Sequence, residues 1–299
     1  MTPVDISELT RLEDKAFQLR TLTLKTVQWA GGGHIGGSLS AMDILTVLYH
    51  HVMNFSVEKA TDPDRDRFIL SKGHIGVGFA PVLSDLGFFP EEWLHNYNKT
   101  GSPLGMHPDS KKVPGVEAST GSLGHGLSVA AGMANASKIS GRDFFTYCLL
   151  GDGECNEGSV WEAAMAASQF GLDHLVAIVD RNHAMIDGPT EDVMGLEPFA
   201  DKWTAFGWKV IDVNGNSIPD LVAVFAEAKR NGNEKTGMPT VLIADTVKGE
   251  GIDFIAGDYT WHYGSFSPEK AVDAEKALAE HHDRRLAALT ARPAKGEEN

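Results

Sequence analysis

Cysteine, basic residues and long apolar runs are scarce in this sequence of 299 residues, and each shortage excludes a class of protein. The two cysteines, Cys148 and Cys155, are too few for a disulfide framework and fit a reducing cytoplasm. Lysine and arginine number 26 against 41 acidic residues, and the net charge of −15 argues against nucleic acid and anionic membranes as partners. No run approaches the ~20 apolar residues that cross a bilayer, and no signal peptide is recognisable. We therefore expect a cytoplasmic protein.

Several common binding and catalytic motifs are also missing. No Cys-x-x-Cys or His-x-x-x-His pair predicts zinc, and no Gly-x-Ser-x-Gly turn predicts a serine nucleophile. Gly31, Gly33 and Gly36 match the spacing of the dinucleotide fingerprint, but that fingerprint follows a strand, and a long helix is predicted here instead. We interpret these glycines as allowing the backbone to approach another group and to present His34.

Strand-like apolar segments alternate with helical patterns along the chain. This alternation predicts an α/β fold with a mainly parallel central sheet and helices on both faces. We expect one domain over residues 1–299, with a frayed tail from about residue 291. The predicted strands cover residues 67–70, 144–150, 175–179, 208–213 and 239–245. The predicted helices include residues 5–30 with Asp5 and Glu8 as a capping box, one capped by Ser38 or Ser40, residues 128–137, and residues 268–290.

Polar turns follow two of these strands about thirty residues apart. Gly151-Asp152-Gly153 ends the first, and Asp180-Arg181-Asn182 ends the second. Each could be only a turn. Together, at the edge where parallel sheets bind ligands, they predict that Asp152 and Asn182 hold Mg²⁺ or Ca²⁺ against a phosphate. A backbone carbonyl near Ala184 is the candidate for a third protein ligand.

Histidines form a second signal. A single loop histidine is usually just exposed, but five of them lie in Gly- or Pro-containing loops or at helix starts, which predicts that they converge on one polar pocket: His34, His74, His107, His125 and His262. Glu157 allows two interpretations. It either places a favourable charge at a helix N-terminus or is a buried carboxylate at a subunit contact.

Taken in order, the motifs resemble the diphosphate-binding half of transketolase from about residue 7 to residue 290. The segments that carry the resemblance are Gly33-His34-Ile35-Gly36-Gly37, Leu70-Ser71-Lys72-Gly73-His74, Gly105-Met106-His107-Pro108, Thr120-Gly121-Ser122-Leu123-Gly124-His125-Gly126, Gly151-Asp152-Gly153, Asp180-Arg181-Asn182 and Trp261-His262-Tyr263-Gly264. Each segment is weak alone, but the ordered set is specific.

The resemblance implies a thiamine diphosphate-binding fold and a role for each matching residue. Asp152, Asn182 and the carbonyl of Ala184 would hold Mg²⁺ on the diphosphate. The residues in contact with the cofactor or close to it would be His74, Gly121, Leu123, Gly153, Asn182 and His262. The catalytic histidines, which would face the ketose donor, would be His34, His74, His107 and His262. The cofactor performs the carbanion chemistry and the protein orients it.

Length is the main departure from the family. A full transketolase also has a pyrimidine-binding domain and a C-terminal domain, and neither fits here, so the resemblance is to the N-terminal subunit of a split transketolase. It implies a partner subunit that carries those domains and the activating glutamate, in an α₂β₂ heterotetramer in which Glu157 would lie at a subunit contact. Smaller departures are Ile35 where Pro is common, His125 where Gln is frequent, and His183 where Lys is common.

The implied activity is transfer of a two-carbon ketol unit from a ketose, as its phosphate or a related sugar, to an aldose. One alternative is the α subunit of a 2-oxo acid dehydrogenase, which shares the metal turn. The loops that carry His34, His107 and His262 favour transketolase over it. A non-catalytic binding or regulatory homologue is a second alternative, against which the retained metal ligands and histidines argue.

Overall fold

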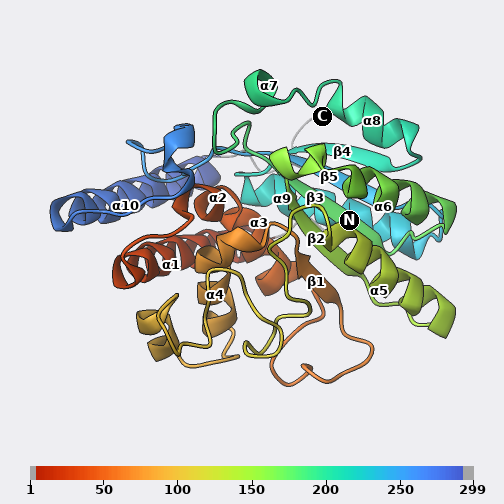
Figure 1. The fold of residues 1–299 in the computed structure, drawn as a ribbon, viewed down its shortest axis with the longest axis horizontal. Coiled ribbons are helices and arrows are strands. Elements are labelled where there is room, and N and C mark those ends of the chain that lie inside the picture. The colour runs from red at the N-terminus through yellow and green to blue at the C-terminus, as the bar shows by residue number, and fades with distance from the viewer. Residues whose placement is uncertain (1–4, 292–299) are drawn as a thin grey trace.

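A five-stranded parallel sheet lies at the centre of the molecule, with strand order β1–β2–β3–β5–β4 and helices on both faces (Figure 1). The structure is a computed structural model that describes residues 5–291. The predicted α/β class with a parallel sheet is confirmed. The predicted frayed tail falls almost entirely outside the described residues.

The strands match the apolar runs of the sequence to within two residues at each end. They are β1 (Arg67–Leu70), β2 (Thr146–Gly151), β3 (Leu175–Arg181), β4 (Lys209–Asn214) and β5 (Thr240–Asp245). The largest difference at a carboxyl end is in β3, which extends two residues beyond the prediction. Asp180 and Arg181 stay in the strand because their backbones pair with Ala244 and Asp245 of β5.

The helices differ from the predictions where they begin and, for the one predicted over residues 128–137, also where it ends. They are α1 (Ile6–Ala30), α2 (Ile35–Ser40), α3 (Met42–Val47), α4 (Gly76–Asp85), α5 (Gly126–Ser140), α6 (Gly158–Gln169), α7 (Thr190–Val193), α8 (Phe199–Ala205), α9 (Ile218–Asn233) and α10 (Pro268–Thr290), with a π-helical turn over Leu48–Val52 and short 3-10 turns over Gly73–Ile75, Glu91–Asn96, Gly153–Asn156 and Tyr259–His262.

Two predicted helix caps are wrong. Asp5 caps α1 as expected, but Glu8 binds Arg11 and His51 instead of completing a capping box. The second helix begins at Ile35, ahead of both candidate serines. Ser38 and Ser40 lie inside it and donate to the carbonyls of His34 and Gly37, because a buried hydroxyl within a helix can bond to the preceding turn.

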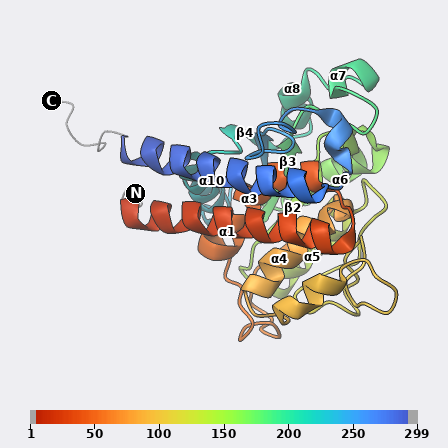
Figure 2. The ribbon, with the colours of Figure 1, turned by 90° about the vertical axis from the view of Figure 1, so that its left-hand side faces the viewer.

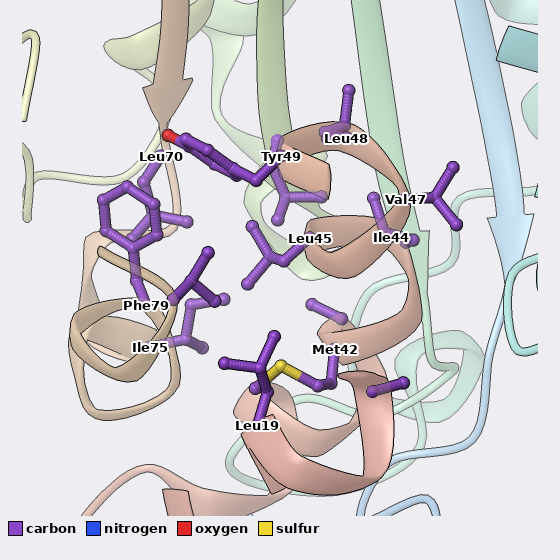
Figure 3. Packing of buried hydrophobic residues seen from close by; sticks show 14 of the residues in the cluster. Leu19, Met42, Ile44, Leu45, Val47, Leu48, Tyr49, Leu70, Ile75 and Phe79 are labelled. Carbon is purple, nitrogen blue, oxygen red and sulfur yellow. The ribbon is translucent and has the colours of Figure 1, made fainter. Parts of the chain in front are cut away.

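Side chains of the strands alternate between two apolar layers, as the two-residue period of a strand requires. Val176 and Ile178 face the layer formed with α1 to α4, α9 and α10. Ala177 and Val179 face the layer formed with α5, α6 and α8. Figure 3 shows part of the first layer, where side chains from α1, α3, α4 and β1 converge. Burial on both faces explains why these strands read as continuous apolar runs.

The first and last helices, α1 and α10, lie side by side and antiparallel (Figure 2). Buried charges join them: Asp43 of α3 accepts hydrogen bonds from Arg20 of α1 and from Arg285 of α10, and Arg285 also pairs with Glu13. Within residues 5–291 no helix is both long and apolar enough to cross a bilayer.

Candidate active site

A cavity of about 400 Å³ opens at the carboxyl edge of the sheet. Residues that closely follow four of the strands line it: Lys72 after β1, Asp152 after β2, Asn182 after β3 and Lys248 after β5. The remaining walls come from glycine-containing turns and loop histidines, namely His34, Gly37, His74, Gly121, Leu123, Gly151, Gly153, Glu154, Ala184, Met185, Ile186, Asp187 and His262. This is the edge at which open parallel sheets bind their ligands.

Asp152 is the first polar group of this edge and is only 2% exposed. Its carboxylate accepts hydrogen bonds from the backbone N–H groups of Gly153 and His183, both at 2.8 Å, and from Arg181 at 3.2 Å. Burial, followed by the nearby charge of Asp180, raises the pKa of Asp152 above its ordinary value. A cation would therefore relieve a strained buried charge.

Asp180 lies beneath the cavity and determines how the Asn182 amide points. The fully buried carboxylate pairs with Lys72 and accepts a hydrogen bond from Asn182 Nδ2 at 3.1 Å. Burial opposes the charge, but Lys72 together with hydrogen bonds from Ser40 and Thr246 outweighs it, and the pKa of Asp180 lies below its ordinary value. With Nδ2 held by a carboxylate, the Asn182 Oδ1 atom faces the other way and accepts from Ala184 N–H.

Lys248 binds the third candidate metal ligand. Its Nζ donates to the carbonyl oxygen of Ala184 at 2.8 Å. The register explains the meeting: Arg181 pairs with Asp245 across β3 and β5, and Ala184 and Lys248 each follow three residues later. Burial, with a further contribution from Lys72, lowers the pKa of Lys248 to about 8.

The donor set suits a hard cation. A carboxylate from Asp152, an amide oxygen from Asn182 and a carbonyl from Ala184 line one cavity, and such oxygen ligands are those that Mg²⁺ and Ca²⁺ prefer. In the described part of the chain no group of three His, Cys, Asp or Glu side chains could hold a metal alone. A metal here would take its other ligands from phosphate or water, and Lys72 and Lys248 supply positive charge for an anion.

The loop over residues 120–124 is attached to the strand ends by Glu154. The Glu154 carboxylate accepts from Ser71 Oγ, from Gly124 N–H at 2.9 Å and from Gly151 N–H at 2.9 Å. Thr120 Oγ1 donates to the Leu70 carbonyl at 2.6 Å. A Cβ at Gly73 would lie 2.5 Å from that same Oγ1 atom, so only glycine allows the loop this close.

Three histidines form a cluster above the cavity, which we call the histidine cluster: His34, His74 and His262. Their ring centroids lie 5.1–5.2 Å apart. Burial is the main cause that lowers their pKa values, to about 4 for His34, about 2 for His74 and about 3 for His262, and neighbouring charges add to it. The three imidazoles are therefore neutral at pH 7. His34 Nδ1 is buried and has no hydrogen-bond partner within the described chain.

A backbone bridge brings His34 and His262 together from opposite ends of the sequence. Gly33 and Gly264 exchange two hydrogen bonds of 3.0 and 2.9 Å. A Cβ at Gly36 would lie 2.6 Å from the Trp261 carbonyl oxygen. The interpretation that these glycines allow a close backbone approach and present His34 is confirmed for Gly33 and Gly36. It is wrong for Gly31, where a Cβ would meet nothing within 4 Å among the described residues and the left-handed backbone instead ends α1.

The other predicted residues lie outside this cluster. His107 is exposed but packs beside Gly121, where a Cβ would come within 3.1 Å of its ring. The convergence predicted for His125 is wrong, because its side chain is exposed at the start of α5 and does not line the cavity. Glu157 is exposed at the N-cap of α6 without a side-chain capping bond.

Five functional candidates were missed by sequence reasoning: Lys72, Glu154, Asp180, Arg181 and Lys248. Lys72, Asp180 and Arg181 lie within the motifs that drew attention to His74 and Asn182, and Glu154 follows Gly153 directly. Lys248 had one available signal, because it follows a strand by three residues. The order of the strands, which places it beside Ala184, is not visible in the sequence.

A second cleft of about 810 Å³ lies beside the first, along the ends of β3, β4 and β5. Its lining includes Asp212, Asp245 and Glu250, and Arg181, which already pairs with carboxylates. No member of the histidine cluster lines it. We therefore place the candidate active site in the smaller cavity.

Comparison with known families finds relatives that match most of the chain. The model for "Transketolase, thiamine diphosphate binding domain" matches residues 13–284. One subunit of the apulose-4-phosphate transketolase of Phocaeicola vulgatus is 42% identical over 269 residues, which cover 90% of this chain and 94% of that protein. The 6-deoxy-6-sulfo-D-fructose transketolase subunit SqwG of a Clostridium species is 40% identical, with 88% of this chain and 95% of that protein covered.

Solved transketolases share the architecture. The enzyme from Campylobacter jejuni superposes with a TM-score of 0.78 at 28% identity, over 93% of this chain and 48% of that chain. The chain thus spans about half the length of the solved transketolases that it matches. Sequence and structure agree that it belongs to the transketolase family and corresponds to the thiamine diphosphate-binding domain of that family.

Proposed function

We propose that this chain is the diphosphate-binding subunit of a two-subunit transketolase, which moves a two-carbon ketol unit from a ketose to an aldose. The observation that carries the proposal is one cavity in which three hard oxygen donors face a cluster of neutral histidines. The family match and the relatives named as transketolase subunits support it.

The oxygen donors would hold the cofactor's tail. Asp152, Asn182 and the Ala184 carbonyl would bind Mg²⁺ on the diphosphate, with Gly153, His74 and His262 beside the phosphates. Gly121 and Leu123 would contact the aminopyrimidine ring. Thiamine diphosphate supplies the carbanion chemistry when bound, and the chain positions it.

The histidines would act on the ketose. A neutral imidazole can donate a hydrogen bond to an oxygen that gains negative charge and can exchange a proton with a hydroxyl. His34 Nδ1 is buried without a partner among the described residues, so a substrate oxygen would satisfy it. His107 would complete this set from the exposed side, beside Gly121.

The remaining parts of the enzyme would come from a second chain type. We assign to that partner the pyrimidine-binding domain, the glutamate that activates the aminopyrimidine, and recognition of the far end of the sugar. The chain described here would be one domain, and the exposed Glu157 would meet another subunit in an α₂β₂ assembly. The two buried free cysteines fit a cytoplasmic location.

The substrate we propose is a ketose phosphate or a related anionic ketose. The two relatives are named for apulose 4-phosphate and for 6-deoxy-6-sulfo-D-fructose, which differ in their anionic group. In this chain the buried cations near the cavity face the diphosphate side, and Lys72 already pairs with Asp180. Selection of the sugar's anion is therefore left to the partner.

The test is to assay ketol transfer with this chain alone, with its candidate partner alone, and with both. We expect activity only from the pair, and only with Mg²⁺ and thiamine diphosphate present. Full activity of the lone chain would contradict a two-subunit enzyme. A pair that prefers a 2-oxo acid to any ketose would favour the 2-oxo acid dehydrogenase alternative, and a pair that turns over no substrate would favour a non-catalytic role.

A further inference from the structure

Two buried lysines reach the cavity, and different kinds of group contact their ammonium groups. Lys72 pairs with the Asp180 carboxylate. Lys248 is only 2% exposed and makes no ion pair within 4.0 Å among residues 5–291. Its ammonium instead lies 2.8 Å from the Ala184 carbonyl oxygen, 3.4 Å from that of Met185 and 3.3 Å from His262 Nδ1. Lys248 is therefore a buried cation whose direct contacts are neutral dipoles, while the charges of Asp152 and Asp180 act on it from beyond ion-pair distance.

The carbonyl that Lys248 binds is the one that the proposed function gives to the metal. A carbonyl oxygen has two lone pairs, so it could serve both cations at once. A metal at an ordinary oxygen–Mg²⁺ distance would then stand roughly 4 Å from the ammonium, in a buried site where like charges repel strongly. A metal and the Lys248 ammonium would therefore repel each other if both bound the Ala184 carbonyl oxygen.

The backbone around Lys248 is held, so only its side chain is free to respond. Gly249 N–H donates to the Gly36 carbonyl at 2.9 Å, and Gly257 N–H donates to the Lys248 carbonyl at 2.8 Å. The stem runs against Gly36, where a Cβ would lie 2.9 Å from Lys248 Cγ. Rotation of the terminal methylenes can still move the ammonium from the carbonyl toward an anion in the cavity.

We propose that Lys248 competes with the divalent metal for the Ala184 carbonyl, and that the diphosphate ends this competition by attracting the ammonium. The inference rests on the proposed function, because it needs the metal and the diphosphate in this cavity. It makes the chain bind the metal weakly by itself and tightly with the diphosphate. Metal and diphosphate would then be taken up together, with a positive coupling that Lys248 provides.

A purely structural role for Lys248 predicts the opposite result. If the lysine only fixes the loop over residues 183–186, its removal loosens the metal ligands and weakens metal binding. If it competes, removal of its charge strengthens metal binding in the absence of the diphosphate. The sign of the change in metal affinity therefore separates the two.

The experiment measures Mn²⁺ binding to the full chain by electron paramagnetic resonance, with and without thiamine diphosphate. The variants are Lys248→Met, which keeps the length of the stem, and Lys248→Gln, which keeps a donor without the charge. Lys276→Met is the matched control, because it removes the same charge from a side chain that is 76% exposed. Circular dichroism verifies that each variant folds.

We expect Lys248→Met to bind Mn²⁺ alone about tenfold more tightly than the parent chain, and the coupling between Mn²⁺ and thiamine diphosphate to fall by a similar factor. Lys248→Gln should gain less, and Lys276→Met should match the parent. Mn²⁺ binding to Lys248→Met that is no tighter than the parent's, including none, would overturn the inference.

Asp152→Asn separates this failure from failure of the proposed function. If Mn²⁺ binding in the presence of thiamine diphosphate survives Asp152→Asn unchanged, the metal site itself is misplaced and the proposed function fails. If that binding is lost while Lys248→Met shows no gain, only the competition by Lys248 is wrong.

Discussion

The two sides of the cavity satisfy their polar groups in opposite ways. On one side Asp152 and Asp180, which we call the carboxylate pair, have hydrogen-bond or charge partners on both oxygens. On the other side the histidine cluster packs ring against ring, and His34 Nδ1 has no partner within residues 5–291. The first side holds carboxylates whose oxygens already have partners, although burial and Asp180 still raise the pKa of Asp152. The second holds neutral imidazoles, of which His34 Nδ1 is left, within the described chain, without a partner for a ligand to satisfy.

The two sides are also positioned by different parts of the fold. The carboxylate pair is built into strand ends and their first turns, so it is organised by the same backbone pairing that forms the sheet. The histidine cluster comes from three loops that meet through glycine contacts. We therefore expect changes in the carboxylate pair to affect folding and cofactor affinity, and changes in the histidine cluster to affect pH dependence and substrate chemistry.

The largest effect is expected for Lys72→Met, which leaves the buried Asp180 charge without its counter-ion. Breaking a buried ion pair costs about 3–5 kcal/mol in the free energy of unfolding. Urea denaturation of the variant and of the control Lys276→Met would measure the difference. A loss under about 1 kcal/mol would show that the hydrogen bonds from Ser40 and Thr246 suffice for Asp180.

Asp152→Ala should have the next largest effect, on the cofactor rather than on the fold. Arg181 keeps Glu191 and Glu197 as partners, so the variant should remain folded. Loss of a buried charged ligand weakens binding by about 3 kcal/mol, or roughly hundredfold. Isothermal titration with thiamine diphosphate and Mg²⁺ would measure it, and unchanged affinity would remove Asp152 from the metal site.

A smaller effect is expected from the histidine cluster as the pH falls. The unfolded chain takes up a proton at each histidine near pH 6.5, whereas the lowered pKa of about 4 keeps folded His34 neutral well below that pH. Stability is therefore complete above pH 7 and decreases from pH 6.5 toward pH 4. After a reduction for solvent exposure, each histidine accounts for about 1 kcal/mol between pH 6.5 and 5.

The corresponding measurement compares the parent chain with His34→Gln by urea denaturation at pH 7, 6 and 5. The variant should lose less stability over this range. Comparing the two chains cancels the contributions of Asp152 and Glu154, whose raised pKa values act in the opposite direction. Parallel pH profiles for the two chains would show that His34 becomes charged in the folded protein.

The smallest effect on the free energy of unfolding is expected for Asp245→Asn, which lies just outside the carboxylate pair. His183 Nε2 and the Asp245 carboxylate form a hydrogen bond of 2.7 Å, but both side chains are more than half exposed. Asp245→Asn should change the free energy of unfolding by less than about 0.5 kcal/mol, because solvent screens the pair. A change as large as that of Lys72→Met would remove the distinction between buried and exposed pairs on which the comparison depends.

Most of the fold could be predicted from the sequence because buried parallel strands appear as apolar runs. Residues 67–70 and 268–290 match β1 and α10, and the other strand ends differ by at most two residues. The helix caps at Ser38 and Ser40 could not be predicted correctly, since a serine hydroxyl bonds equally well to a preceding turn inside a helix.

The candidate site, like the fold, could be predicted only in part from the sequence. Asp152, Asn182 and the histidines were found because they follow strands or occupy glycine-containing loops. His125 shares that local setting and yet is exposed at the start of α5 and does not line the cavity. Local pattern thus names candidates, and it cannot say which of them point inward.

The sequence by itself determined the strands, the polar turns that end them and the glycines that allow close contacts, because each depends on residues near one another in the chain. Only the tertiary structure decided which turns meet. β5 lies between β3 and β4, and its pairing with β3 places Lys248 against Ala184. Separately, the backbone bridge between Gly33 and Gly264 brings His262 against His34. Strand order and loop contacts arise from packing between distant segments, and no local pattern records them.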